Sequence, residues 1–187
     1  MTLPTTSLAG ARDPAGAPRT SALLTVDIAR TAAASVLDPE VPVLTIDDLG
    51  VLRGVEVDDE GGVTVTVTPT YSGCPAMEVI EHDVAEAVRA VGFETVTVRR
   101  VLSPAWTTDW MSAEGRRKLE DYGIAPPGAA AAPHHLTDGP VALSLSVRCP
   151  QCGSLDTRET SRFGSTACKS LWQCQACREP FDHFKAI

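Results

Sequence analysis

The stretch Cys149-Pro-Gln-Cys152, followed after twenty-one residues by Cys174-Gln-Ala-Cys177, decides the fold of the C-terminal part of this chain. Two residues between thiols allow one tight turn to aim both sulfurs at one ion, and two such turns complete a tetrahedron of thiolates, as in a zinc ribbon. Pro150 and Gly153 suit the first turn, because proline fixes φ and glycine tolerates the left-handed conformation. The spacing predicts a metal site, with a disulfide pair or two separate redox motifs as alternatives.

A fifth cysteine, Cys168, lies between the two pairs and gives this region one thiol more than a four-coordinate ion takes. It is interpreted as a packed residue, as an exchange ligand, or as a sign of an iron-sulfur cluster in place of zinc. Because paired C-x-x-C turns usually form a closed zinc site, Zn²⁺ is expected, with a cluster as the alternative. His183 is a weaker candidate ligand, and ordinary structural explanations are preferred for all four histidines.

Charge and hydropathy exclude several classes of protein. The 187 residues carry a formal net charge of -8. Residues 1–148 hold 11 Lys and Arg against 20 Asp and Glu, whereas 149–187 hold 5 against 4, so no basic stripe for nucleic acid is expected. No run approaches the roughly twenty apolar residues needed to cross a bilayer. Since the N-terminus also lacks the pattern of a secretory signal, we expect a cytoplasmic protein with reduced cysteines.

Shifts in composition divide the chain into four segments. Residues 1–20 are expected to be a disordered lead-in, and 125–140, rich in Ala and Pro, a linker. These segments leave one domain at 21–124 and a four-cysteine module at 141–187. The small module must draw much of its stability from metal, on the order of 10 kcal/mol. Its candidate core residues are Leu155, Phe163, Leu171, Trp172, Phe181 and Phe184.

Hydrophobic periodicity predicts an α+β fold for the first domain. This prediction rests on apolar residues at helical spacing, on alternating valines around a Gly-rich turn, and on a break in the helical pattern at Asp38-Pro39. The cysteine module is expected to be β-rich. The expected elements of the first domain are a helix at 23–37, a hairpin of strands at 51–57 and 63–68, a helix at 77–91, a strand at 95–102 and a short helix at 112–122.

Cys74 is the candidate functional thiol, because it lies where a strand gives way to a helix. Pro75 fits the first helical position, which puts Cys74 at or near the N-cap. The helix N–H groups and macrodipole favour a thiolate there, so we expect a lowered pKa. The alternative is a small buried cysteine. Asp38 and Glu40 belong to a polar cluster that could sit over Cys74, although Asp38 could equally serve only the turn.

A loop of hydroxyls, an acid and two tryptophans is the third candidate site. Aromatic residues in a loop often mark contact with a partner, but two tryptophans can also plug the end of a small domain. Both interpretations stay open. The residues concerned are Trp106, Thr107, Thr108, Asp109 and Trp110.

Several of these motifs resemble those of two known protein families. Asp38-Pro39-Glu40-Val41-Pro42, Tyr71-Ser72-Gly73-Cys74-Pro75 and the run from Trp106 to Met111 resemble the SufT-type domain of iron-sulfur assembly factors. The segment Phe163-Gly164-Ser165-Thr166-Ala167-Cys168-Lys169, with the two cysteine pairs, resembles the PaaD family of aerobic phenylacetate degradation. That family is named as a subunit of the multicomponent phenylacetyl-CoA epoxidase (ring 1,2-epoxidase).

The resemblance implies an accessory role, in which Cys74, with Asp38 and Glu40 as neighbours, handles iron or an iron-sulfur cluster transiently. It implies partners among the other epoxidase components, especially the iron-sulfur flavin reductase, and among general iron-sulfur assembly proteins. The residues themselves contain no Gly-rich phosphate loop or Glu-x-x-His pair, so catalysis by this chain alone is not expected. The alternative is a permanent, non-catalytic scaffolding subunit.

Overall fold

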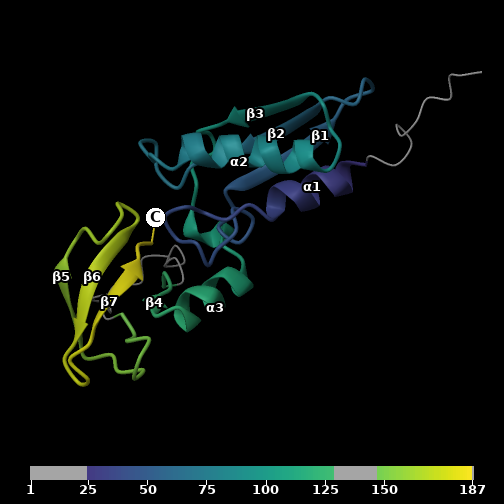
Figure 1. Ribbon diagram of the computed structural model, residues 1–187. Helices are drawn as coiled ribbons and strands as arrows, with labels where there is room; N and C mark the ends of the chain where they lie inside the picture. The colour runs from purple at the N-terminus through teal and green to yellow at the C-terminus, as the bar shows by residue number, and fades with distance from the viewer. Residues whose placement is uncertain (1–24, 129–146, 187) are drawn as a thin grey trace, which may run out of the picture.

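The computed structural model describes residues 25–128 and 147–186. Helices and a three-stranded sheet form one part of the molecule, and a four-stranded sheet forms the other (Figure 1). This mixed architecture confirms the α+β class expected from the sequence. The expected lead-in at 1–20 and most of the expected linker at 125–140 lie outside the described residues.

The first sheet has the strand order β1-β2-β3. β1 (Leu52–Val57) and β2 (Val63–Val67) form the antiparallel hairpin that the alternating valines predicted. β3 (Val96–Arg100) pairs with β2 in parallel, which requires a crossover connection. Along β2 the valines are buried and the threonines are half-buried, so one face of the sheet packs on the core.

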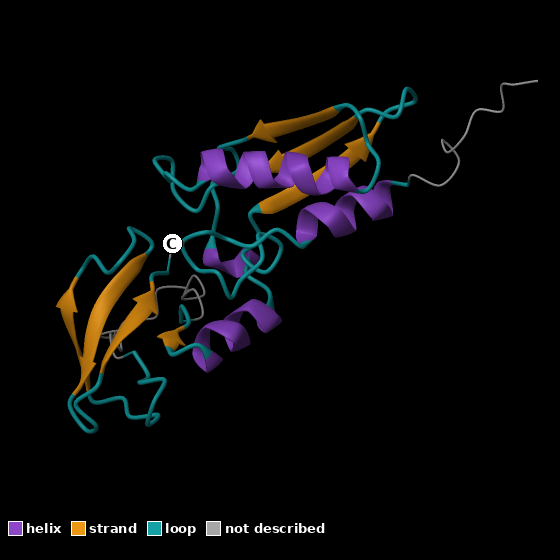
Figure 2. Cartoon of the chain, viewed as in Figure 1, coloured by secondary structure: helices purple, strands orange, loops and turns teal. Residues whose placement is uncertain are grey.

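Two helices lie side by side on that face of the sheet (Figure 2). α1 (Val26–Ala34) precedes the hairpin, and α2 (Met77–Ala90) is the crossover between β2 and β3. Both helices present an apolar stripe to the sheet. The buried residues of these stripes are Ala29, Ala33, Met77, Ile80, Val84, Ala85 and Val88.

The loop between α1 and β1 is packed into the core. α1 ends earlier than the Asp38-Pro39 break predicted, because Leu37 leaves the helix and forms an isolated bridge with Thr45. Val41, Leu44, Ile46 and Leu49 in this loop are almost fully buried. The loop therefore has a fixed conformation, and it carries Asp38 and Glu40.

The second sheet has the strand order β4-β7-β6-β5. It follows a one-turn helix η1 (Thr108–Trp110) and α3 (Ala113–Asp121). β4 (Ile124–Ala125) comes from the first part of the chain and pairs in parallel with β7 (Pro180–Phe184). β6 (Lys169–Cys174) pairs with β7 and with β5 (Thr157–Ser161) in antiparallel fashion. Residue 125, where the linker was expected to begin, is therefore part of a sheet.

Half of the core predicted for the cysteine module is confirmed. Trp172, Phe181 and Phe184 are buried, and Phe184 belongs to the same core cluster as the helices of the first part. The prediction was wrong for the other three residues, because Leu155 and Phe163 lie in exposed loops beside β5 and Leu171 is exposed on β6. Their exposed fractions are 52% for Leu155, 69% for Phe163 and 37% for Leu171.

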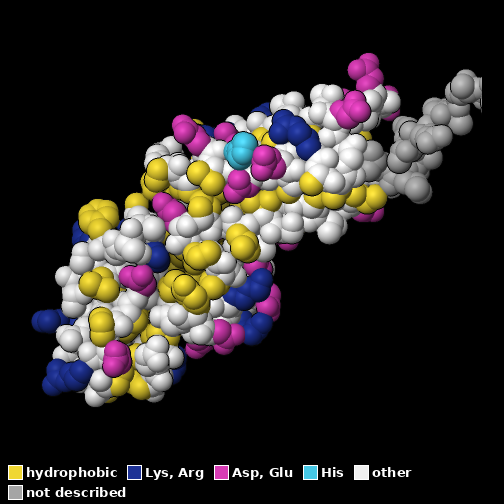
Figure 3. Space-filling model, in the orientation of Figure 1, with side chains coloured by type: hydrophobic (Ala, Val, Ile, Leu, Met, Phe, Trp, Pro, Cys, Tyr) yellow, Lys and Arg dark blue, Asp and Glu magenta, His cyan; other side chains and the backbone are white. Residues whose placement is uncertain are grey.

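The surface carries both signs of charge. On the face drawn in Figure 3, acidic and basic side chains are interspersed over the helical part, and hydrophobic side chains gather where the two parts meet. Across residues 25–128 and 147–186, no helix is long and apolar enough to span a membrane.

Candidate functional site

The four paired cysteines converge on one point. The first turn is closed by the N–H of Gly153, which donates to the carbonyl of Cys149 at 2.9 Å, and Gly153 has the positive φ of 74° that the sequence predicted. The second turn is closed in the same way by Arg178, whose N–H donates to the carbonyl of Cys174 at 3.1 Å. The sulfurs of Cys149, Cys152, Cys174 and Cys177 all lie within 4.8 Å of one another.

The sulfur spacing fits a tetrahedral metal site. Sγ atoms are 3.8 Å apart for Cys149 and Cys177, and 3.6 Å apart for Cys152 and Cys174. Four thiolates bound to zinc at about 2.3 Å would lie about 3.8 Å from one another, whereas a disulfide needs about 2.05 Å. All six cysteines are free, so the disulfide alternative does not describe this fold. The donor set and its geometry support metal binding here.

The backbone also favours a thiolate in this group. The N–H of Cys177 points at the sulfur of Cys174 at 3.5 Å. This hydrogen bond, together with one from Ala176, lowers the pKa of Cys174. A sulfur that loses its proton easily is a better ligand for a metal cation.

Cys168 does not belong to the four-cysteine group. It lies just before β6, is 4% exposed, and packs in the core cluster of the first part of the chain. Its sulfur lies 3.0 Å from Oγ1 of Thr166 and 3.8 Å from Oε2 of Glu40. Burial raises the pKa of the Cys168 thiol to about 11. The surplus thiol thus has surroundings of its own, next to a residue of the other candidate site.

Cys74 lies in the turn that leads into α2. The helix begins at Met77 with Ala76 as its N-cap, so Pro75 is not the first helical residue, and this detail of the prediction was wrong. The N–H of Cys74 donates to the carbonyl of Tyr71 at 3.2 Å, which adds a turn between strand and helix. Cys74 is half-buried and remains near the helix start.

The pKa expected for Cys74 was also wrong in direction. Burial raises the pKa of this thiol, and the negative charges of Glu40 and Asp38 raise it further. The N–H groups of Ala76 and Met77 do point at the thiol and oppose the shift, as the helix argument requires, but they are outweighed. The sequence showed the helix start and not the two carboxylates that the fold brings to it.

Asp38 builds the turn that presents Glu40. Its buried Oδ1 accepts hydrogen bonds from the N–H groups of Glu40 at 2.9 Å and Val41 at 2.8 Å. Burial raises the pKa of Asp38, and burial followed by the charge of Asp38 raises the pKa of Glu40. Two carboxyls and the Cys74 thiol thus share a place where negative charge is disfavoured. A metal cation arriving there would relieve this repulsion.

Two further residues complete this neighbourhood, and sequence reasoning missed both. Tyr71 lies close to Cys74, because burial and then the charge of that thiol raise the pKa of its phenol group. Lys169 is 5% exposed, and its charge acts on both Asp38 and Glu40. Lys169 immediately follows Cys168 in the segment that carried the family resemblance, which was the only sequence signal for it.

The loop from Trp106 to Trp110, called the tryptophan loop below, is mainly part of the packed interior. Trp106 is 4% exposed and its Nε1 donates to the carbonyl of Leu49 at 2.9 Å, while Thr108 is fully buried. These two residues offer no surface to a partner. Trp110 is half-buried, and the guanidinium of Arg53 lies 3.5 Å from the centre of its ring. Partner contact remains a prediction for the more exposed residues of the loop, Thr107, Asp109 and Trp110.

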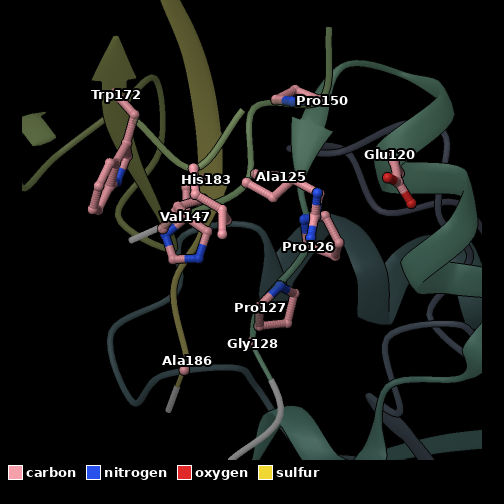
Figure 4. Close-up of a pocket in the computed structure, with 12 residues that line it drawn as sticks. Glu120, Ala125, Pro126, Pro127, Gly128, Val147, Pro150, Trp172, His183 and Ala186 are labelled. Atoms are coloured by element: carbon pink, nitrogen blue, oxygen red, sulfur yellow. The ribbon is translucent and has the colours of Figure 1, made fainter. Parts of the chain in front are cut away.

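A pocket of about 600 Å³ lies between the second sheet and the segment after α3 (Figure 4). Trp172 and His183 from the sheet face it on one side, and Ala125, Pro126 and Pro127 on the other. Its lining is mostly apolar, with Glu120, Arg148 and His183 as the ionisable groups. Since several distant segments form it, no sequence pattern predicted it. Of the candidate ligands named from the sequence, His183 alone lines this pocket.

Two family models match the two parts of the chain. Residues 28–99 match a family described as iron-sulfur cluster assembly protein, and residues 135–185 match the PaaD zinc beta ribbon domain. The molecule is therefore an iron-sulfur-assembly-type domain joined to a zinc-ribbon-type module.

A similar protein that aligns with most of the chain shows its family. A protein of Escherichia coli K12, provisionally named as one of the subunits of 1,2-phenylacetyl-CoA epoxidase, is 51% identical over 150 residues, which cover 80% of this chain and 86% of that protein. The chain belongs to this family, the PaaD family. An Fe-S protein maturation auxiliary factor of Porphyromonas gingivalis is 41% identical over 86 residues, covering 46% of this chain and 81% of that protein.

Solved structures also align with part of the chain. A domain of unknown function from Bacillus anthracis aligns with a TM-score of 0.47 and 26% identity, covering 50% of this chain and 90% of that one. A conserved hypothetical protein from Thermotoga maritima aligns with a TM-score of 0.45 and 32% identity, covering 51% of this chain and 94% of that one.

Proposed function

We propose that this chain is a non-catalytic maturation factor of the multicomponent phenylacetyl-CoA 1,2-epoxidase, acting in the cytoplasm on the iron-sulfur cluster of the reductase component. The observation that carries the proposal is the half-buried Cys74 thiol beside Asp38 and Glu40, in a domain of the iron-sulfur-assembly type. Because the chain belongs to the PaaD family, we take the phenylacetyl-CoA epoxidase as the enzyme complex that it assists. General iron-sulfur assembly proteins are further proposed partners.

The chemistry of this cluster suits transient handling of iron. A thiol and carboxylates are ligands that iron accepts. Binding requires the thiol to lose its proton, so the raised pKa of Cys74 weakens the hold on iron at neutral pH. A carrier must release its cargo, and a moderate affinity serves release better than a closed site does.

For the ribbon we propose a resident Zn²⁺ bound by Cys149, Cys152, Cys174 and Cys177. When bound, the ion would close the module as a structural cross-link. Elemental analysis and visible absorption of protein purified without oxygen test this: one zinc per chain and no colour are expected. A brown protein with iron in place of zinc would contradict it and support a cluster at these four cysteines.

The test of the main proposal is the cluster content of the reductase in cells. With Cys74→Ser, the reductase purified from those cells should carry several-fold less iron and sulfide, while this chain still associates with the epoxidase components. Ser72→Ala, two positions away on an exposed residue, is the matched control and should leave the content unchanged.

Unchanged cluster content in the Cys74→Ser strain, with the complex intact, would reject the maturation role. The chain would then be a permanent scaffolding subunit. The attachment of the ribbon to the first part through β4 and β7 is the observation that favours this second candidate, because a scaffold needs a fixed shape.

A further inference from the structure

The fifth thiol of the ribbon lies at the junction with the first part of the chain. The sulfur of Cys168 is 3.8 Å from Oε2 of Glu40, a residue 128 positions earlier. The charge of Glu40 acts on Cys74 as well, so this carboxylate lies within electrostatic range of both thiols. Glu40 therefore contacts one thiol of the ribbon and acts electrostatically on a thiol of the first part of the chain.

We infer that Cys168 is a second sulfur donor of the cargo site, and that Cys74, Cys168 and Glu40 together bind a ferrous ion. This inference rests on the proposed function, because it takes iron as the cargo. Two thiolates and one carboxylate form a mixed donor set that iron accepts. The ribbon then holds a metal of its own through four cysteines and also lends a ligand to the neighbouring site.

The segment before β6 fixes the position of Cys168. The N–H of Gly164 donates to the carbonyl of Lys169 at 2.8 Å and closes the loop. The N–H of Lys185 donates to the carbonyl of Cys168 at 2.9 Å and ties it to the end of the chain. A Cβ on Gly164 would lie 2.9 Å from Oδ1 of Asp182 and 3.2 Å from Cβ of Lys169, so a glycine suits this close approach of the loop. A rigid backbone thus presents the thiol.

A buried cation stands next to the same donors. Lys169 follows Cys168 directly, and its Nζ lies 3.5 Å from Oδ2 of Asp182. Its charge also acts on Asp38, Glu40 and Cys168. Lys169 offsets part of the repulsion among these groups, so the junction can stay folded before a metal cation arrives.

The three donors are near one another without being converged. Among residues 25–128 and 147–186, only the four-cysteine group has three or more such ligand atoms that all lie within 4.8 Å of one another. Binding at Glu40 therefore requires side-chain rotation that draws the two thiols together. Cys74 and Glu40 are half-buried, so an ion can reach them from solvent.

The test is a titration of the full chain, loaded with its ribbon metal, with ferrous iron alone in the absence of oxygen. Calorimetry should show one Fe²⁺ bound per chain. Cys74→Ser and Cys168→Ser should each weaken binding at least tenfold, and Glu40→Gln should weaken it less. Ser170→Ala is the matched control, because Ser170 is buried on β6 two positions from Cys168 and brings no sulfur.

A Cys168→Ser protein that keeps its ribbon metal and binds Fe²⁺ as tightly as the unaltered chain would overturn the inference. Should that variant fold poorly, X-ray absorption at the iron edge of the unaltered protein decides the question. Two sulfur neighbours around iron are expected, and a single sulfur would overturn the inference.

Cluster content of the reductase separates this inference from the proposed function. If Cys74→Ser lowers the content and Cys168→Ser does not, the maturation role stands and the second donor is rejected. If both thiols bind Fe²⁺ in the purified chain but neither substitution changes the reductase, the composite site stands and the maturation role is rejected.

Discussion

The ring of Trp106 packs against the ring of Phe184, with 6.2 Å between centroids and 56° between planes. Trp106 belongs to the loop after β3, and Phe184 ends the last strand of the ribbon. Both side chains lie in one hydrophobic cluster. This contact holds the two parts of the molecule together a short distance from the junction of Glu40 and Cys168.

Replacement of Trp106 by Phe should destabilise the fold by about 1–2 kcal/mol. The ring contact with Phe184 can persist, but the buried carbonyl of Leu49 loses its hydrogen-bond donor. Denaturant unfolding followed by circular dichroism measures the loss. Trp110→Phe is the control and should cost less, because Trp110 is half-buried and its main contact is the charge of Arg53. Equal losses would contradict the importance of the Leu49 hydrogen bond.

Gly50 is required for the approach of the tryptophan loop to the hairpin. Its φ is +70°, and an added Cβ would lie 2.5 Å from the carbonyl oxygen of Trp110. Gly50→Ala should therefore lower the free energy of unfolding by about 2–3 kcal/mol. Gly54→Ala on β1 is the matched change, since no atom lies within 4 Å of its Cβ position. If Gly50→Ala lowers the free energy of unfolding no more than Gly54→Ala does, the tryptophan loop can move aside to accept the Cβ.

Asp38 should prove to be a positioning residue for Glu40. Asp38→Ala leaves the N–H groups of Glu40 and Val41 without their acceptor and should cost about 2–3 kcal/mol of stability. Asp38→Asn keeps an oxygen in place and should lose less than half of that. Thermal unfolding of both variants gives the comparison. An Asn variant as unstable as the Ala variant would mean that the charge, and not the turn, is what matters.

Acid should destabilise the ribbon through His183. Burial lowers the pKa of His183 to about 4, whereas its value in the unfolded chain is about 6.5. Between these two pH values the unfolded chain binds more protons than the folded chain. The free energy of unfolding therefore has its full value above about pH 6.5 and declines as the pH falls toward 4. With allowance for partial exposure, the loss is about 2 kcal/mol.

His183→Gln provides the check on this pH dependence. It removes the titrating ring beside Ser170 and Trp172 while keeping a polar group. The difference in unfolding free energy between pH 7 and pH 4.5 should be smaller in the variant than in the unaltered chain. Identical differences would show that His183 does not titrate in this range.

Short-range sequence patterns predicted helices and strands of the first part and the two C-x-x-C turns of the ribbon. The alternating valines gave β1 and β2, the apolar steps from Met77 gave α2, and the C-x-x-C spacing gave the four-sulfur group. Each of these rests on neighbours within a few positions of one another, for which backbone geometry and local burial are decisive.

The errors arose where distant segments meet. The thiol of Cys74 was expected to be acidified by its helix, and it is instead dominated by burial and by carboxylates more than thirty positions away. Cys168 and Glu40 are 128 positions apart, and nothing in either segment predicts their contact. Such pairings depend on how whole modules dock, which periodicity does not encode.

The pairing of β4 with β7 bears on any attempt to study the ribbon alone. A fragment that starts after Ala125 would lack the strand that covers β7 and would expose a row of unpaired amide and carbonyl groups. Such an unpaired strand edge can pair with the edge of a second copy. Aggregation of an excised ribbon would therefore be expected even with its metal bound, because the neighbouring strand is missing.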